Sequence, residues 1–249
     1  MPGIDLNCDM GEGFSSDEEL MPYISSANIA CGYHAGDADT MKRTVDLCLK
    51  YNVAVGAHPS YPDRDNFGRT DMLYNGLQPE DLPAILAEQI NLMEAVCKTA
   101  GAKLRHIKPH GALYNRAAKD IVLSRLICDT ICEIDPTLIL YGLSGSVMGT
   151  TAAQCGLAFR SEVFADRNYQ RDGSLRPRTM PDALITDHNK CIQHVLQMVN
   201  NGKVTTIGGD EIPIRAETIC IHGDGAHAVE FAKLIFDELN KNGIKIAHG

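Results

Sequence analysis

The chain has 249 residues, of which 44% are hydrophobic and 22% charged, and its formal net charge at pH 7 is -9. This length suits one α/β barrel or two smaller domains, and the acidic balance disfavours proteins that bind nucleic acids or anionic membranes through basic patches. The first residues contain no basic stretch followed by an apolar one, and no segment approaches the roughly 18 apolar residues of a membrane span. Together with nine scattered cysteines, an odd number, this predicts a cytoplasmic protein with reduced thiols.

Short apolar runs alternate with amphipathic helical patterns along the chain. The apolar runs predict strands at residues 4–8, 28–31, 53–58, 104–109, 138–143, 158–164 and 218–222. Helical periodicity relates the apolar residues within 41–49, 82–97, 123–134 and 192–199, and a last helix should start near Ala226 and end near Asn242 and Gly243.

Uninterrupted strand–helix alternation predicts a parallel sheet in an α/β protein. No linker rich in proline, glycine or serine divides the chain, so we expect one domain spanning residues 1–249. A small hairpin should interrupt it at residues 204–214, with glycines at the turn. About seven strand–helix units favour a closed or nearly closed barrel, and a doubly wound open sheet is the alternative.

Two long polar segments, residues 59–79 and 166–181, directly follow predicted strands. Long loops in compact domains are usually functional, and active sites of α/β barrels lie on the loops after the strands. Arginines on these loops suit a carboxylate or phosphate because the guanidinium group presents a planar fork. For Arg171 and Arg176 we expect simple solvation at the surface.

Polar residues alternate with apolar ones inside three of the strands, and others follow strand ends. A buried parallel strand is ordinarily apolar on both faces, so these polar faces need a common polar place such as the upper interior of a barrel. Burying them unpaired would cost several kcal/mol each. Strand by strand they are Asp5, Asn7 and Asp9; Asn28, Cys31 and His34; His58; His106, Lys108 and His110; Glu162; and Cys220, His222 and Asp224. This density of polar strand ends predicts an enzyme active site.

The residues leave two chemistries open. A divalent metal such as zinc or manganese could activate water, although no HExxH helix is present. The candidate ligands are Asp5, Asp9, His34, His58 and His222. Without a metal, Asp9 or Glu162 would act as general base and Lys108 as electrophilic partner. We expect burial to depress the pKa of Lys108, and a purely structural ion pair of this lysine is the alternative.

Motifs of other enzyme classes are missing. There is no GxxxxGK[ST] phosphate loop and no GxGxxG segment after a strand. The segment Gly142 to Ser146 is not a GxSxG elbow, because its fifth residue is serine.

Several long segments resemble the LamB/YcsF family, in order, from near the first residue to the last helix. They are DLNCDMGEGF (5–14), SANIACGYHAGD (26–37), GAHPSYPD (56–63), FGR (67–69), KPHGALYN (108–115), EVFADR (162–167) and CIHGD (220–224). The resemblance implies a seven-stranded (β/α) barrel of the glycoside hydrolase/deacetylase type. It also implies 5-oxoprolinase activity, a hydrolase reaction on a cyclic amide in which 5-oxo-L-proline, ATP and water give L-glutamate, ADP and phosphate.

The resemblance further implies two partner subunits, B and C, with ATP as co-substrate and magnesium accompanying it, which would explain the missing phosphate loop. We assign catalytic roles to Asp9, Lys108, His110, Glu162 and Asp224. Substrate binding is assigned to Asn7, Asn28, His58, Arg69 and Arg167. Two alternatives remain: a stand-alone metal-dependent amidase or deacetylase, and a non-catalytic subunit that only binds the substrate. A homo-oligomer is also possible.

Overall fold

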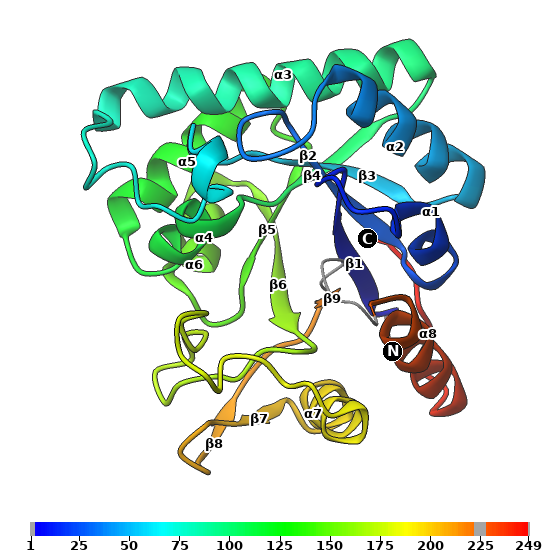
Figure 1. Ribbon diagram of the computed structural model, residues 1–249. Helices are drawn as coiled ribbons and strands as arrows, with labels where there is room; N and C mark the ends of the chain where they lie inside the picture. Colours follow the sequence, from blue (N-terminus) through cyan, green and yellow to red (C-terminus); the bar gives the residue numbers. More distant parts are fainter. Residues whose placement is uncertain (1–2, 222–227, 249) are drawn as a thin grey trace.

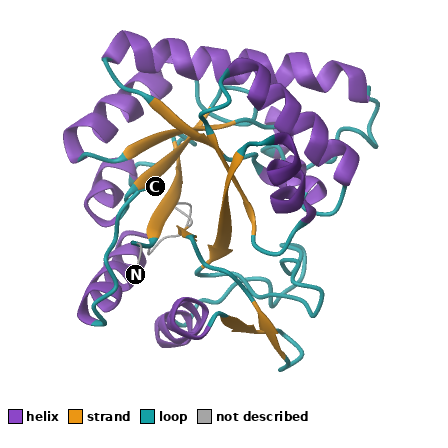
Figure 2. Ribbon diagram, turned by 180° about the vertical axis from the view of Figure 1, so that it is seen from behind, coloured by secondary structure: helices purple, strands orange, loops and turns teal. Residues whose placement is uncertain are grey.

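Seven parallel strands close into a barrel in the order β1-β2-β3-β4-β5-β6-β9. The computed structural model describes residues 3–221 and 228–248, and helices surround the strands in both views (Figure 1, Figure 2). The closed barrel confirms the predicted fold class and excludes the open sheet. The barrel strands are β1 (Asp5–Met10), β2 (Ser26–Ala30), β3 (Ala54–His58), β4 (Leu104–Ile107), β5 (Ile139–Leu143), β6 (Ala158–Phe164) and β9 (Thr218–Ile221).

Helices connect most successive strands. They are α1 (Asp17–Leu20), α2 (Ala38–Tyr51), α3 (Leu82–Ala100), α4 (Gly111–Ala117), α5 (Ile121–Ile134), α6 (Val147–Cys155), α7 (His188–Asn201) and α8 (Ala228–Lys241). Three 3-10 turns lie at Met21–Tyr23, Arg64–Asn66 and Pro79–Asp81. None of the described helices is long and apolar enough to cross a membrane.

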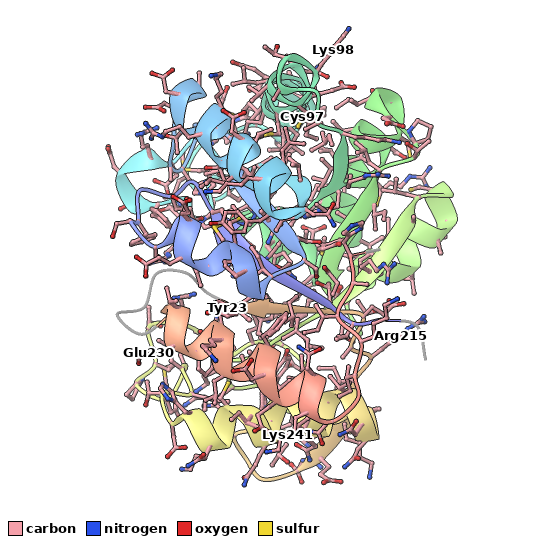
Figure 3. All side chains as sticks on the ribbon, turned by 90° about the vertical axis from the view of Figure 1, so that its right-hand side faces the viewer. Tyr23, Cys97, Lys98, Arg215, Glu230 and Lys241 are labelled. Atoms are coloured by element: carbon pink, nitrogen blue, oxygen red, sulfur yellow. The ribbon has the colours of Figure 1, made fainter. Side chains whose placement is uncertain are left out.

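The long helix α3 shows how the amphipathic pattern produces the layer outside the barrel. Leu86, Ile90, Met93 and Cys97 recur every three or four residues and are all buried. Figure 3 shows Cys97 on the inner side of this helix, whereas Lys98 points away from the molecule. The helix ends at Ala100, and the following Gly101, with φ of 75°, donates its N–H group back to the last turn.

The two described ends of the chain lie side by side. Ile4 and Ile246 form a parallel bridge beside β1. Helix α8 packs against the turn at Tyr23, whose ring meets Phe236 edge-on at 5.9 Å, and Figure 3 shows Tyr23 beside this helix.

The connection from β6 to β9 carries the most additional structure. The strands β7 (Lys203–Thr205) and β8 (Glu211–Pro213) pair antiparallel and lie with α7 outside the barrel (Figure 1). Because β6 pairs directly with β9, this segment leaves the barrel and returns without adding a barrel strand. Its first part, the loop after β6, reaches over one end of the barrel.

Candidate active site

The lower part of the barrel interior, near the start of β1, holds a carboxylate, Asp5, whose two oxygens both accept hydrogen bonds from hydroxyl groups. Asp5 is fully buried, and its two oxygens accept hydrogen bonds from the hydroxyls of Ser25 at 2.6 Å, Ser26 at 2.7 Å and Thr218 at 2.6 Å. Three short hydrogen bonds to hydroxyls compensate its loss of hydration. We call Asp5, Ser25, Ser26 and Thr218 the lower group. The geometry makes Asp5 a structural residue.

A chain of side-chain amides leads upward from the lower group. Asn7 donates hydrogen bonds to Thr218 at 2.7 Å and to Glu162 at 3.0 Å. The amide of Asn28 donates to Asn7 Oδ1 at 2.7 Å and to Asp9 Oδ1 at 2.8 Å. These two asparagines are fully buried and hold other polar groups in place.

His106 of β4 contacts Asn28 of β2 across the intervening strand β3. This is possible because β3 has Gly56, which lacks a side chain, at this position. Its Nε2 lies 2.8 Å from Asn28 Oδ1, and its ring stacks on Tyr141 at 4.1 Å. A Cβ atom on Gly56 would lie 2.0 Å from this ring nitrogen. The glycine in β3 is therefore required by the position of His106.

Lys108, at the end of β4, contacts carboxylates from β1 and β6 on the other side of the barrel interior. Its Nζ lies 2.8 Å from Asp9 Oδ1 and 2.9 Å from Glu162 Oε1, with Asn7 Oδ1 at 3.2 Å and Cys220 Sγ at 3.1 Å. Burial lowers the pKa of Lys108, but the nearby Asp9, Cys220 and Glu162 raise it by more, and the net result lies well above its usual value. The expected depressed pKa is therefore wrong, because two carboxylates converge on the ammonium group. Lys108 is a fixed positive charge.

Three histidines and a glutamate gather beside this lysine. Glu12, His34, His58 and His110, which we call the histidine cluster, each offer one ligand atom, and these four atoms lie within 4.8 Å of one another. Glu12 Oε1 lies 3.0 Å from His34 Nε2, 3.5 Å from His110 Nδ1 and 3.9 Å from His58 Nε2. Asp9 Oδ2 is 3.4 Å from His58 Nε2, at the edge of the cluster. Such a donor set can hold a metal ion.

The pKa values of the three imidazoles are shifted in different directions. Burial lowers the pKa of His34 to about 2, and burial with the neighbouring histidines lowers the pKa of His110 well below its usual value. Burial also lowers the pKa of His58, but the Asp9 carboxylate raises it by more, so that it is raised overall. His34 and His110 are therefore neutral and stack at 3.8 Å.

The loops after β1 and β3 bring the cluster together. Gly11, with φ of 70°, turns the chain at the end of β1 just before Glu12. Gly68 has φ of 64°, and a Cβ atom there would lie 2.8 Å from the His110 ring and 3.0 Å from His34. The backbone of the first long loop thus closes directly over the imidazoles, which only a glycine permits.

A cavity of about 380 Å³ opens beside the cluster, within the usual size range of small-ligand pockets. The C-terminal ends of the barrel strands and both long loops form its walls. Its lining residues include Asp9, Glu12, His58, Phe67, Arg69, Lys108, His110, Tyr114, Lys119, Leu143, Phe164, Arg167, Gln170, Arg176 and Arg178. The lining therefore combines carboxylates, imidazoles and Lys108 with several arginines.

Arg167 is the most buried of the cavity arginines, with 5% of its surface exposed. It donates a hydrogen bond to the carbonyl oxygen of Arg176 at 2.6 Å, and its Nε has no hydrogen-bond partner among the described residues. Burial and the nearby Arg178 lower its pKa. A buried guanidinium group with an unused donor at a cavity wall is suited to bind an anion.

The other loop arginines separate into two kinds. Arg69 stacks over the ring of Phe67 at 5.0 Å and lines the cavity. Arg171 is exposed and pairs with Asp210 at 3.6 Å, as surface solvation predicts. Arg176 lines the cavity and pairs with Asp182 at 2.9 Å, so the expectation of simple solvation is wrong for this residue. Its loop folds back over the barrel instead of pointing into solvent.

The structure sorts the residues predicted from the sequence into three sets. Those that line the cavity are Asp9, His58, Lys108, His110, Arg69 and Arg167. Those buried behind it are Asn7, Asn28 and Glu162, together with His34 of the cluster and the remote Asp5. His222 and Asp224 lie outside the described residues.

Sequence reasoning missed Glu12 and Tyr114 as site residues. Glu12 follows β1 at odds with the alternating pattern, and only the turn at Gly11 directs it toward the histidines. Tyr114 lines the cavity from α4, and burial with the Glu162 carboxylate raises its pKa well above the usual value. Both residues lie in segments that resemble the LamB/YcsF family, residues 5–14 and 108–115, so every polar residue of these segments could have been considered for the site.

Comparisons with known proteins agree over the whole chain. The sequence profile of the LamB/YcsF family matches residues 4–249. A protein of Haemophilus influenzae (strain PittEE) that is named as the A subunit of 5-oxoprolinase is 50% identical over 246 residues, which is 99% of each chain. The crystal structure of a lactam utilization protein from Thermus thermophilus superposes with a TM-score of 0.91 at 39% identity, covering 98% of this chain and 99% of that one.

More distant structures share the barrel. A deacetylase solved with its substrate superposes with a TM-score of 0.51 at 15% identity, covering 98% of this chain and 87% of that one. At this identity the likeness concerns the fold alone.

Proposed function

Because the chain belongs to the LamB/YcsF family, we propose that it is the A subunit of an ATP-dependent 5-oxoprolinase, which opens 5-oxo-L-proline to L-glutamate. Relatives named as the A subunit of 5-oxoprolinase match essentially the full length of this chain. The lettered name implies that those relatives work in a complex of several subunits. We extend this to the present chain, with subunits B and C as its partners.

The cavity above the barrel carries this proposal. A small cyclic amide with a carboxylate needs a cation for the carboxylate and an opposing set of acid–base groups for the amide. Arg167 and Arg69 line the cavity together with Asp9, Lys108 and three members of the histidine cluster, Glu12, His58 and His110. We therefore propose that Arg167 or Arg69 binds the carboxylate of 5-oxoproline and that the amide faces Lys108.

Asp9 is the proposed general base. Among the two carboxylates held by Lys108, Asp9 lines the cavity whereas Glu162 is fully buried behind it. Asp9 takes a proton from the attacking water, and the ammonium group of Lys108 stabilises negative charge that develops on the phosphorylated amide group. His110 donates its Nε2 proton to the Phe67 carbonyl oxygen and turns Nδ1 toward His58, so it has no proton to offer this group. Glu162 and Asn7 then keep the ammonium group of Lys108 in position. Substrate contacts of Asn7 and Asn28 do not fit this arrangement, since both are fully buried.

ATP supplies the activation that a five-membered lactam requires. Transfer of its terminal phosphoryl group to the amide oxygen makes the ring carbon electrophilic and releases ADP. One water adds to that carbon, the C–N bond breaks, and the ring nitrogen takes a proton. A second water then cleaves the resulting acyl phosphate into glutamate and phosphate.

We assign most of the ATP and magnesium handling to subunits B and C, because this chain has no phosphate-binding glycine loop. We also propose a cytoplasmic location, in keeping with nine cysteines that are all free.

Reconstitution tests the proposal. We would purify this chain alone and with subunits B and C, and measure glutamate formed from 5-oxo-L-proline with and without ATP. Glutamate should form only when both partners and ATP are present. Full activity of both Asp9→Asn and Lys108→Ala in the assembled complex would contradict the mechanism.

The histidine cluster favours one second candidate, a stand-alone metal-dependent amidase or deacetylase. Hydrolysis of an amide or acetylated substrate by the lone chain, with metal and without ATP, would support it. If the Asp9 and Lys108 variants retained activity in the complex, the chain would instead be a substrate-binding subunit.

A further inference from the structure

Hydrogen bonds to two backbone carbonyls fix which nitrogens of His58 and His110 carry protons. His58 Nδ1 lies 2.6 Å from the carbonyl oxygen of Lys108, and His110 Nε2 lies 2.9 Å from that of Phe67. A carbonyl oxygen only accepts hydrogen bonds, so both of these nitrogens must be protonated donors. The remaining nitrogens, His58 Nε2 and His110 Nδ1, are then bare lone pairs whenever the two rings are neutral.

These two nitrogens face each other at 2.9 Å. Two lone pairs at this distance repel, and the contact is stable only if a positive species lies between them. A shared proton would satisfy this one pair. Beside this pair, Glu12 Oε1 lies within 3.9 Å of nitrogens of His34, His58 and His110, so that four ligand atoms lie within 4.8 Å of one another.

We propose that Glu12, His34, His58 and His110 bind a divalent transition-metal ion through Glu12 Oε1, His34 Nε2, His58 Nε2 and His110 Nδ1. Three imidazoles and one carboxylate form a donor set typical of zinc, and softer thiolates and additional carboxylates are not among them. The two backbone carbonyls then act as the outer partners that orient ligand imidazoles in metal sites.

The position of the four residues predicts an ion that small molecules can reach. Glu12, His58 and His110 line the cavity, whereas His34 is buried behind them. Asp9 Oδ2, 3.4 Å from His58 Nε2, stands next to the ion on the cavity side. The proposed ligands differ from the set expected from the sequence, because they add Glu12 and His110 and leave out Asp5, while Asp9 stands beside them. His222, which was also expected, lies outside the described residues.

The test measures metal content and does not depend on catalysis, so it can succeed or fail separately from the proposed 5-oxoprolinase activity. Untagged chain stripped with a chelator should bind one equivalent of zinc per chain in isothermal titration calorimetry. His110→Ala should weaken binding by about 100-fold or more, and the isosteric Glu12→Gln by at least about 10-fold, because each removes one ligand. The exposed His188→Ala variant is the matched control and should retain full binding.

Circular dichroism would establish that each variant is folded, and Glu12→Gln keeps the test valid if His110→Ala does not fold. In zinc-loaded ¹⁵N-labelled protein, the shifts of His58 Nε2 and His110 Nδ1 should move together, while His188 stays unchanged. Absence of stoichiometric binding to the folded wild-type chain, with NMR showing a proton shared by His58 and His110, would overturn the proposal.

Discussion

Asp5 and Asp9 lie on the same strand and face the same barrel interior, yet their surroundings differ in kind. The carboxylate of Asp5 accepts hydrogen bonds from three hydroxyls of the lower group and contacts no lysine or arginine among the described residues. Asp9 contacts Lys108 at 2.8 Å and His58 at 3.4 Å, and it lines the cavity. We call Asp9, Lys108 and the histidine cluster the upper group.

The difference shows how one polar barrel interior serves two purposes. In the lower group every oxygen of the buried acid has a neutral partner, so the group closes the barrel and has nothing left to offer a ligand. In the upper group charges are concentrated and two imidazole nitrogens face each other at 2.9 Å, and beside it in the cavity Arg167 keeps an unused donor. Unsatisfied groups of this kind cost stability and are retained where a ligand binds.

The largest expected effect comes from removing the charge at the centre of the upper group. Lys108→Met leaves Asp9 and Glu162 buried without their shared cation, which should lower the free energy of unfolding by about 3–5 kcal/mol. Glutamate formation by the assembled complex should fall by at least about 100-fold. Urea unfolding and a coupled glutamate assay would measure these changes.

Lys98→Met on the outer face of α3 is the control and should alter neither quantity. A Lys108→Met chain as stable as wild type would mean that the two carboxylates do not depend on the lysine.

The lower group should respond in stability alone. Asp5→Asn replaces one acceptor oxygen with a donor that faces either the hydroxyls of Ser25 and Ser26 or that of Thr218, and it should lower the free energy of unfolding by about 2–3 kcal/mol. The turnover number of the folded fraction should stay within about twofold of wild type. Urea unfolding and the glutamate assay at low temperature would separate the two effects.

Arg167 should show the reverse of Asp5, with an effect on activity and no loss of stability. Arg167→Met removes the proposed partner of the substrate carboxylate, and the loss of charged hydrogen bonds should lower kcat/KM for 5-oxo-L-proline by about 10–100-fold. The free energy of unfolding should stay equal or rise, because a buried charge with an unused donor disappears. The exposed Arg171→Met variant should leave both unchanged, and a marked loss of stability without an effect on KM would give Arg167 a structural role.

The smallest effect concerns His106, which lies between the two groups. Burial, with smaller effects of Lys108 and His58, lowers its pKa to about 3. Below about pH 6.5 the imidazole takes up a proton in the unfolded chain but not in the folded chain. The contribution of His106 to the free energy of unfolding is therefore complete above that pH and is lost as the pH falls toward 3.

The expected loss is at most about 1.4 kcal/mol per pH unit. His106→Asn should therefore show a shallower decline of unfolding free energy between pH 6.5 and 5 than wild type, and a parallel curve above pH 7. Identical slopes for both proteins would refute the buried neutral imidazole.

Much of the fold follows from local patterns in the sequence. The predicted strand at 158–164 coincides with β6, and those at 53–58 and 138–143 begin one residue before β3 and β5. Helices α4 and α6 were not anticipated, since α4 is only two turns long and α6 contains a glycine and two threonines instead of a regular apolar stripe.

The site was only partly predictable. Alternation along single strands identifies Asp9, Lys108 and His110 as inward-facing. It cannot tell that Glu162, from another strand, meets Lys108, and this convergence reverses the direction of the lysine's pKa shift. Nor can a local pattern show that Asp5 is hydrogen-bonded only to hydroxyls, whereas Asp9 contacts Lys108 and lines the cavity. Those distinctions depend on contacts between residues far apart in the chain.

A paired measurement of Asp5→Asn and Asp9→Asn tests the central claim most directly. Each variant would be assembled with subunits B and C, and glutamate formation from 5-oxo-L-proline and ATP would be measured per folded chain. The account predicts that Asp9→Asn lowers turnover by at least about 100-fold, because the proposed base is lost, and that Asp5→Asn retains it. Equal turnover of the two variants would contradict the division of the barrel interior into a structural lower group and a catalytic upper group.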